Sequence, residues 1–220
     1  MSYLINLIIA GRPAVVLGGG TVAARKVNDL LQCGADVTVV SPEVCRQVDE
    51  MAAARRIHVH LRPYEADDLR GAFLVVAATD DEALNVEISR DAQSLGVLVN
   101  VVDRPRLCTF TLPAVIRRGD LTMAVSTEGQ CPALASVMRE ELAGQFGEEY
   151  ADVVSTLGAL RRELIRRGWP GDRVREAVRE LYGAGIADMI RTHNQLALAD
   201  LWHKVLGEDF IPPQYSTFVP

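Results

Sequence analysis

The sequence predicts an α/β protein that begins with a doubly wound parallel sheet and ends in a helical domain. Five short apolar runs alternate with helical stretches in the first half of the chain, which is typical of βαβ units. The first run ends in three consecutive glycines that open a helix. After residue 132 the apolar residues recur at three- and four-residue spacing, which predicts helices.

The expected elements follow one another with the period of βαβ units. Strands are expected at 15–17, 37–40, 57–61, 73–78 and 97–102, where β-branched and aliphatic residues are grouped. Helices are expected at 21–32, 44–54 and 82–95, and Gly34 and Gly96 end the first and the last of them. Strands that alternate with helices pair in parallel, so these elements predict one parallel sheet.

A different pattern begins near residue 109. Short apolar runs at 110–112, 115–116 and 121–125 surround a Gly-Asp turn, which predicts a strand pair. Breaks at 168–171 and 183–185 divide the helical part that follows. We therefore expect three regions: a sheet domain at 1–107, a small β/α region at 108–145 and a helical domain at 146–220. For the last region, packing against a partner and packing on its own core remain equally open.

Composition and charge narrow the classes of function. The 220 residues are 49% hydrophobic and 24% charged, as in ordinary globular proteins. The formal net charge of -6, without any block of Lys and Arg, argues against nucleic-acid binding. The apolar stretch at 1–10 is shorter than a membrane span of about 20 residues and lacks a basic flank, so neither a signal peptide nor a membrane anchor is expected.

The cysteines indicate a reducing compartment. They are widely spaced, contain no CxxC pair and form no dense framework of the kind that secreted domains use. We therefore expect free thiols and a cytoplasmic location. The four residues are Cys33, Cys45, Cys108 and Cys131.

Gly18, Gly20 and Ala23 occupy the three defining positions of the G-x-G-x-x-G/A fingerprint. The first permits a tight turn, the second lets backbone N–H groups reach a pyrophosphate, and the third lets the helix pack on the strand. The motif follows a predicted strand and opens a predicted helix, so it predicts a Rossmann-like dinucleotide site. A tight turn without a ligand is the structural alternative.

The end of the second strand bears on the choice of cofactor. An acidic residue that binds the ribose is expected about 20 positions after the glycines, but Ser41, Pro42 and Glu43 stand there. Ser41 can hydrogen-bond a ribose hydroxyl, and Glu43 lies close enough in sequence to accept another. The nearest arginine is Arg46, so the sequence favours NAD over NADP.

Asp103 follows the fifth predicted strand, at the edge where open α/β sheets bind ligands. Its carboxylate would serve as a general base if burial made it basic enough at the working pH. An aspartate that caps the turn before Arg104 is the alternative. Asp80 and Asp81 follow the fourth strand in the same way, and we expect them to cap the next helix.

Histidines and arginines complete the set of candidate ligand residues. His58 and His60 share one face of a predicted strand, but two histidines alone do not make a metal site, so no metal is expected. Arginines in an acidic protein predict a ligand rich in carboxylates, with solvated surface arginines as the alternative. These arginines are Arg104, Arg106, Arg117, Arg118 and Arg139.

Four separated segments together resemble the precorrin-2 dehydrogenases of siroheme biosynthesis, including the N-terminal module of the bifunctional siroheme synthases. They are GGGTVAARK at 18–26, AATDD at 77–81, NVVD at 100–103 and AVSTEGQCPALA at 124–135. Order, kind and spacing agree over about residues 1–145, whereas the tail is similar only in being helical. The chain departs from the family at Thr127, where a serine is usual, and at Cys131, where Ser or Thr is usual.

The resemblance implies oxidation of the tetrapyrrole precorrin-2 to sirohydrochlorin, with NAD as hydride acceptor, in a homodimer held together by its helical parts. It assigns catalysis to Asp103, and dimerisation and a substrate cleft to region 108–145. The expected cofactor contacts are Gly18, Gly19, Gly20, Thr21, Val22, Ser41, Pro42, Glu43 and Thr79. The expected substrate contacts are Arg104, Arg117, Arg118 and Thr127.

Alternative functions remain open. Some relatives also insert ferrous iron or cobalt, and Asp103 would then accept the pyrrole protons. A non-catalytic NAD-sensing module would need no substrate cleft, whereas the loops at 100–105 and 126–132 both indicate one. A dehydrogenase of small hydroxy acids would place His or Lys beside the cofactor, and neither stands at a predicted strand end.

Overall fold

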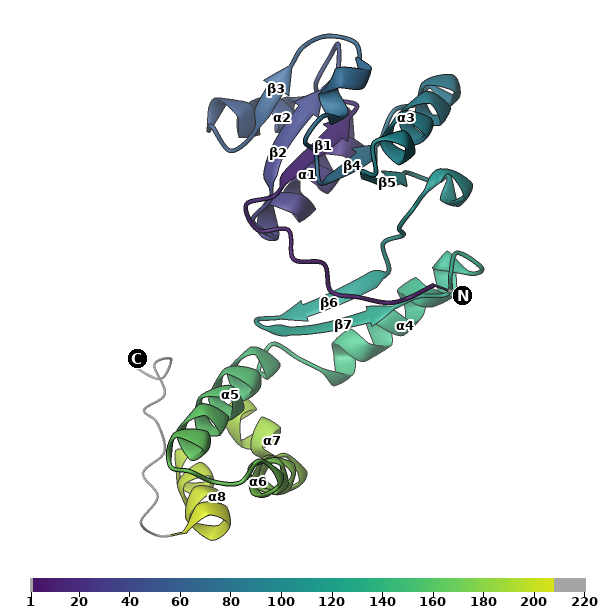
Figure 1. The fold of residues 1–220 in the computed structure, drawn as a ribbon. Coiled ribbons are helices and arrows are strands. Elements are labelled where there is room, and N and C mark those ends of the chain that lie inside the picture. The colour runs from purple at the N-terminus through teal and green to yellow at the C-terminus, as the bar shows by residue number, and fades with distance from the viewer. Residues whose placement is uncertain (1, 208–220) are drawn as a thin grey trace. The chain divides into compact units, whose positions relative to one another are not determined.

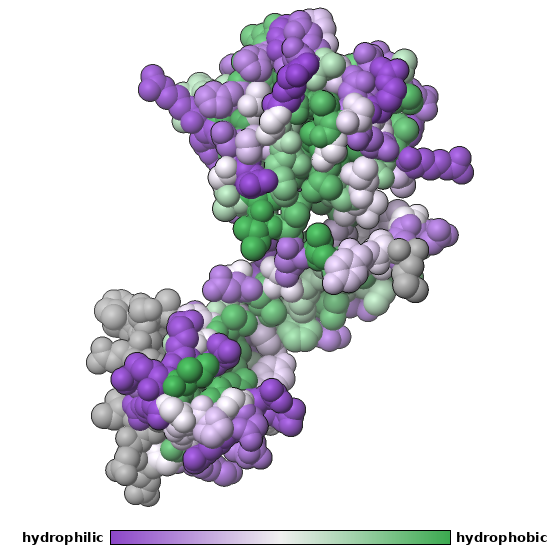
Figure 2. Space-filling model, in the orientation of Figure 1, coloured by the Kyte–Doolittle hydropathy of each residue, from purple (hydrophilic) through white to green (hydrophobic). Residues whose placement is uncertain are grey.

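The computed structural model describes residues 2–207. The chain divides into two compact units, Met1–Leu112 and Pro113–Pro220, each with its own buried apolar core (Figure 1). The strand pair and helix that the sequence places in a separate region at 108–145 belong largely to the second unit. Hydrophilic and hydrophobic side chains both reach the visible surface (Figure 2).

Five parallel strands form the sheet of the first unit, in the order β3-β2-β1-β4-β5. The doubly wound parallel sheet expected from the sequence is thereby confirmed. The strands are β1 (Pro13–Leu17), β2 (Asp36–Val40), β3 (His58–His60), β4 (Leu74–Ala77) and β5 (Leu98–Val101).

Helices cover both faces of this sheet (Figure 1). Alternate residues of a strand point to opposite faces, so β1 contributes Val16 to one core cluster and Val15 and Leu17 to the other. The Val16 cluster includes residues of α1 (Thr21–Gln32) and α2 (Arg46–Ala53). The other cluster includes residues of α3 (Glu82–Ser94) and of the short 3-10 helix η1 (Ala66–Leu69).

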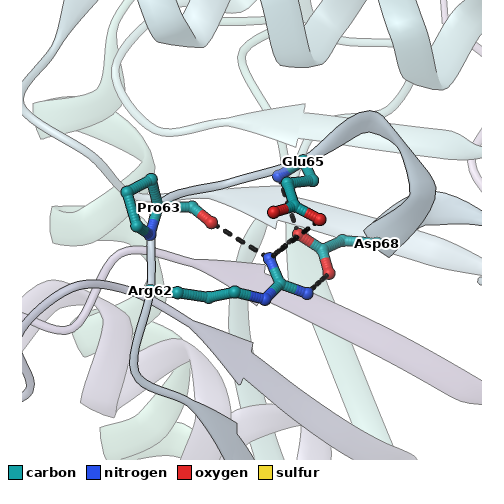
Figure 3. A network of polar contacts seen from close by, with 4 residues as sticks. All are labelled: Arg62, Pro63, Glu65 and Asp68. Atoms are coloured by element: carbon teal, nitrogen blue, oxygen red, sulfur yellow. Dashed lines mark hydrogen bonds and ion pairs between the residues drawn. The ribbon is translucent and has the colours of Figure 1, made fainter.

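A polar network holds the connector between β3 and β4 (Figure 3). Arg62 donates to the two carboxylate oxygens of Asp68 at 2.9 and 2.5 Å, and to the carbonyl of Pro63 at 3.0 Å. The backbone N–H of Glu65 donates to the same carboxylate at 2.9 Å. Burial alone would raise the pKa of Asp68, but these hydrogen bonds and the Arg62 charge outweigh it and hold the pKa below its usual value.

The second unit begins with an antiparallel strand pair, β6 (Ala114–Arg118) and β7 (Leu121–Val125). The expected strand pair is therefore confirmed, with Gly119 in the turn at a φ of +53°. The run at 110–112 lies before the first of these strands and forms no strand itself. Helix α4 (Pro132–Gln145) packs on the pair.

Four further helices form a bundle with a core of its own. Its most buried side chains include Leu160, Leu164, Leu181, Ile186 and Trp202. Of the two interpretations that the sequence left open for this region, packing on its own core is therefore observed. The helices are α5 (Tyr150–Arg166), α6 (Gly171–Gly183), α7 (Ile186–Arg191) and α8 (Gln195–Leu206). Among the described residues, no helix has the length and apolar character needed to cross a membrane.

Candidate dinucleotide and catalytic site

The carboxyl ends of four strands lie side by side in the first unit and form one edge of the sheet. The chain leaves β1 towards β2 and leaves β4 towards β5, so the winding reverses between the neighbours β1 and β4. Open α/β sheets bind ligands at such a switch point, outside the carboxyl ends of the strands. The residues paired across this edge are Val40, Leu17, Ala77 and Val101.

Gly18 and Gly19 are required by the packing of the loops at this edge. Gly18 has a φ of +109°, and an added Cβ would lie 2.5 Å from the carbonyl oxygen of Ala78. A Cβ on Gly19 would overlap the carbonyl oxygen of Glu43. The N–H of Cys45 donates to the carbonyl of Gly19 at 2.7 Å. Both glycines thus let the loops after β1, β2 and β4 approach one another.

Gly20 differs from the other two glycines. Its backbone is extended, with φ -76° and ψ -175°, and an added Cβ would meet nothing within 4 Å. The first turn of α1 that follows has no side-chain cap and no acidic residue. Its N–H groups have no intrahelical acceptor and carry partial positive charge. An open, uncapped helix end beside a residue without a side chain fits a dinucleotide pyrophosphate.

The residues after β2 shape a loop beside the glycines. The buried hydroxyl of Ser41 donates to the carbonyl of Glu43 at 2.7 Å, so its proton is used within the loop. Pro42 and Glu43 are exposed. Arg46, the nearest arginine, is held 2.7 Å from the carboxylate of Glu50.

Thr79 ties the loop after β4 to helix α3. Its hydroxyl donates to Oδ1 of Asn85 at 3.0 Å, and Nδ2 of Asn85 donates back to the carbonyl of Thr79 at 2.9 Å. Asp81 accepts from the N–H of Leu84 at 3.0 Å, so the helix cap expected there is confirmed. The hydroxyl oxygen of Thr79 retains the capacity to accept a hydrogen bond from a ligand. Nothing in the sequence pattern signalled the part played by Asn85.

Asp103 lies in an exposed turn after β5. Its φ is +58°, in the left-handed region that costs most non-glycine residues energy but that aspartate tolerates better than most. The residue is exposed within this unit, so the burial considered for it from the sequence is not found there. Arg104 donates to the carbonyl of Asp103 at 3.3 Å and lies 3.4 Å from the carboxylate of Glu82.

Arg118 of the second unit is occupied by its own surroundings. Its guanidinium donates to the carbonyls of Phe146 at 3.0 Å and Ala143 at 3.4 Å, and Glu148 lies 3.2 Å away. These carbonyls belong to the C-terminal end of α4, where a cation is favourable. The side chain is only 17% exposed. Its position in the sequence gave no signal of this capping role.

Arg117 and Thr127 also belong to the second unit. Arg117 is exposed on β6. The hydroxyl oxygen of Thr127 accepts from the N–H of Cys131 at 3.2 Å and so closes the loop that leads into α4. That loop includes Glu128 and Gly129, with φ values of +51° and +77°.

The two strand histidines stand apart from these sites. His58 and His60 are exposed on β3, at the opposite edge of the sheet from β5. Within residues 2–207, no group of three or more His, Cys, Asp and Glu side chains is placed to hold a metal ion.

Comparisons with known proteins agree with this arrangement. A family model described as "Putative NAD(P)-binding" matches residues 5–114. A second model, described as "Sirohaem biosynthesis protein central", matches residues 118–145. Together the two models cover most of the sheet unit and the strand pair with α4.

Two curated relatives are both called siroheme synthase. The one from Ectopseudomonas mendocina is 42% identical over 162 residues, which is 74% of this chain and 34% of the relative. The one from Nitrosococcus oceani is 35% identical over 221 residues, which is 100% of this chain and 47% of the relative. The chain thus spans about a third to a half of the length of these relatives.

A solved structure is similar over nearly the whole chain. It is described as SirC, precorrin-2 dehydrogenase, and matches with a TM-score of 0.73 and 28% sequence identity. The match covers 93% of this chain and 98% of the other. The similarity therefore includes the helical unit as well as the sheet.

Proposed function

Because the chain belongs to the NAD(P)-binding family of siroheme biosynthesis, we propose that it oxidises precorrin-2 to sirohydrochlorin with NAD as hydride acceptor. One observation carries the proposal: the uncapped N-terminus of α1 and the turn that holds Asp103 lie at the same edge of the sheet, two strands apart. The match to a precorrin-2 dehydrogenase over 93% of the chain supports the choice of substrate.

The glycine loop and α1 would hold the dinucleotide. Backbone N–H groups at Gly20, Thr21 and Val22 would face the pyrophosphate, and the ribose would lie near the loop formed by Pro42 and Glu43. Thr79 would receive a hydrogen bond from the cofactor on the other side of the switch point. When bound, the nicotinamide supplies the acceptor for a hydride.

Asp103 would complete the oxidation as a general base. Loss of two hydrogens from precorrin-2 separates into a hydride, which leaves for the cofactor, and a proton, which needs a base. The carboxylate of Asp103 follows β5, which neighbours β4 at the switch point. It would accept the proton directly from the substrate carbon or nitrogen and release it to solvent, to which the residue is exposed.

The substrate's carboxylates would need cationic and hydroxyl partners. Arg104 stands next to Asp103, and its guanidinium keeps donors beyond its 3.4 Å pair with Glu82. We propose that Arg117 and Thr127 also bind the substrate. Arg118 would act indirectly, because its guanidinium is taken up by the end of α4.

NAD rather than NADP is part of the proposal. A 2′-phosphate would lie near the loop after β2, where Glu43 is exposed and would repel it. Arg46, the arginine best placed to accept a phosphate, is paired with Glu50. The expected preference is therefore for the cofactor that carries a free 2′-hydroxyl.

We also propose that the protein acts as a homodimer in the cytoplasm. Leu134, Val137 and Met138 form an apolar stripe on α4 and are 49%, 51% and 41% exposed. Hydrophobic atoms are visible where β6, β7 and α4 lie (Figure 2). A second copy of the chain would cover this stripe. All four cysteines are free thiols, which fits a reducing compartment.

The test is a spectroscopic assay with purified protein and anaerobic precorrin-2. Absorbance is followed with NAD, with NADP or without cofactor, and in parallel with ferrous or cobalt ion. We expect sirohydrochlorin to form when NAD is present and more slowly with NADP. A spectral change with metal that exceeds the protein-free control would add a chelatase activity. Bound NAD without any NAD-dependent change would contradict the dehydrogenase and favour a sensor module.

A further inference from the structure

Residues 105–110, the folded-back segment, follow the turn after β5 and return along the outer edge of that strand. β5 is the last strand of the sheet, so its odd-numbered residues direct their N–H and C=O groups away from β4. The N–H of Val99 donates to Oγ1 of Thr109 at 2.8 Å, and its carbonyl accepts from the N–H of Thr109 at 2.8 Å. The N–H of Val101 donates to Sγ of Cys108 at 3.1 Å. Two side chains and the backbone N–H of Thr109 thus take the place of a sixth strand along these residues.

Cys108 bonds to both ends of the turn that contains Asp103. Besides accepting from the N–H of Val101, its thiol lies 3.3 Å from the carbonyl of Val101 and 3.3 Å from that of Arg104. The buried side chain of Asn100 adds a contact of 3.7 Å from Nδ2 to Sγ and donates to the carbonyl of Phe110 at 3.0 Å. One sulfur atom therefore links the backbone before and after Asp103.

The turn needs such support because its backbone is strained. Asp103 has a φ of +58°, and residues in this region persist where their surroundings hold them. The turn's own backbone contributes one bond, from the N–H of Arg104 to the carbonyl of Val101 at 3.2 Å. Two further backbone bonds hold it: the N–H of Val102 donates to the carbonyl of Ala77 at 2.9 Å, and the N–H of Leu107 donates to the carbonyl of Arg104 at 3.0 Å. The side-chain bonds from residues 105–110 to the turn are those of Cys108.

We propose that Cys108 is a positioning residue, which holds the backbone of Asp103 in its left-handed conformation and so fixes the direction of the Asp103 carboxylate. The inference rests on the proposed function, in which Asp103 takes the proton from precorrin-2. Cys108 itself need not touch the substrate.

The chemistry of the thiol suits this task. Burial raises the pKa of Cys108, an effect that the hydrogen bond from Val101 partly offsets. The side chain therefore remains a protonated thiol at neutral pH and can donate to one carbonyl while accepting from an N–H. A serine hydroxyl offers the same donor and acceptor with a shorter reach, and alanine offers neither.

The experiment compares Cys108→Ala and Cys108→Ser with a matched control in the full-length protein. The control is Ser89→Ala, which removes a 2.7 Å hydrogen bond to the carbonyl of Leu107 and none of the bonds that Cys108 makes. We expect Cys108→Ala to lower kcat about tenfold with little change in KM or in NAD affinity. Cys108→Ser should recover most of the lost rate, and Ser89→Ala should stay within about twofold of wild type.

Two further measurements make the outcome decisive. The Arg104 amide closes the turn, so its hydrogen exchange in Cys108→Ala should be about fivefold faster than in wild type. Adding Cys108→Ala to Asp103→Asn should cause no further loss of kcat, because both changes act through one carboxylate. Fully additive losses, unchanged Arg104 exchange, or an equal loss in Ser89→Ala would each overturn the proposal.

The proposed function and this inference fail in different ways. Wild-type turnover in Asp103→Asn would remove Asp103 from the reaction and would overturn the positioning role with it. A large loss in Asp103→Asn together with wild-type kcat in Cys108→Ala would leave the function standing and overturn the role of Cys108 alone.

Discussion

Gly18 lies directly against the main chain that follows β4, because a Cβ placed on it would come 2.5 Å from the carbonyl oxygen of Ala78. Gly20, two residues later, has no neighbour within 4 Å of such a Cβ. The two glycines of the same fingerprint therefore serve different purposes. Gly18 joins two loops of the protein, whereas Gly20 keeps space free outside it.

Gly20→Ala should separate ligand binding from folding. The extended backbone at Gly20 accepts alanine without strain, but alanine is less favourable than glycine at a helix N-cap, so we expect thermal stability close to that of wild type. The added methyl group would stand where the pyrophosphate approaches, and NAD affinity should fall about tenfold or more. Calorimetric titration measures the affinity. Gly18→Ala is the contrasting variant and should lose stability, and normal NAD binding by Gly20→Ala would remove Gly20 from the cofactor site.

Asp103→Asn should abolish most of the turnover and leave NAD binding intact. Asparagine tolerates the φ of +58° at least as well as aspartate, so the variant removes the charge and keeps the backbone. A missing general base costs a factor of about 10² to 10⁴ in rate. Asp103→Ala should lose turnover too, and it adds backbone strain of about 1 kcal/mol or more. Initial rates with precorrin-2 and NAD measure the loss, and unchanged rates would contradict the role of Asp103 as general base.

Asp68→Asn should weaken the first unit at neutral pH and not in acid. The folded-state pKa of Asp68 lies below its unfolded value of about 3.9, so its contribution to stability is fully present above that value. It is lost as the pH falls through the folded pKa. We expect a loss of about 1 to 2 kcal/mol at pH 7, and convergence with wild type in strong acid.

Urea unfolding at several pH values measures this difference. Asp67→Asn is the matched control, because the ion pair of Asp67 with Arg70 is largely exposed, at 77% and 73%. Such a pair contributes only about 0 to 1 kcal/mol. Equal effects of the two variants would show that the partly buried network in Figure 3 contributes no more than a surface pair.

Arg118→Ala should destabilise the second unit. The carbonyls of Ala143 and Phe146 would lose their charged donor, at a cost of about 1 to 3 kcal/mol in the free energy of unfolding. Arg118→Lys should recover part of this loss, since an ammonium group still favours a helix C-terminus. Circular dichroism during thermal unfolding measures the change. Unaltered stability together with a raised KM for precorrin-2 would instead favour a direct substrate contact.

Local sequence patterns were enough to predict much of the fold and part of the candidate site. The first helix begins and ends at the predicted residues, Thr21 and Gln32, because three glycines precede it and Gly34 follows it closely. The helix cap by Asp81 was also predictable from the local sequence, since a cap acts within one turn of its helix. The five strands were predictable as short apolar runs between turns.

The polar contacts that shape the site were not predictable in this way. Arg118 resembled a surface arginine in sequence, but tertiary packing brings the end of α4 to its guanidinium. Ser41 appeared available to a ribose, yet its proton bonds to the carbonyl of Glu43. From the sequence alone, Cys108 was one of four widely spaced thiols. Its partners on β5 become its neighbours only when the chain folds back.

The folded-back segment also determines how the sheet ends. An edge strand normally presents unpaired N–H and C=O groups on which another chain can add a strand, and this is a common route to aggregation. On β5 the outward groups of Val99 and Val101 are already bonded, by Thr109, Cys108 and Arg104. The sheet therefore offers no ladder for a further strand along these residues, and self-association of the chain has to use a different surface.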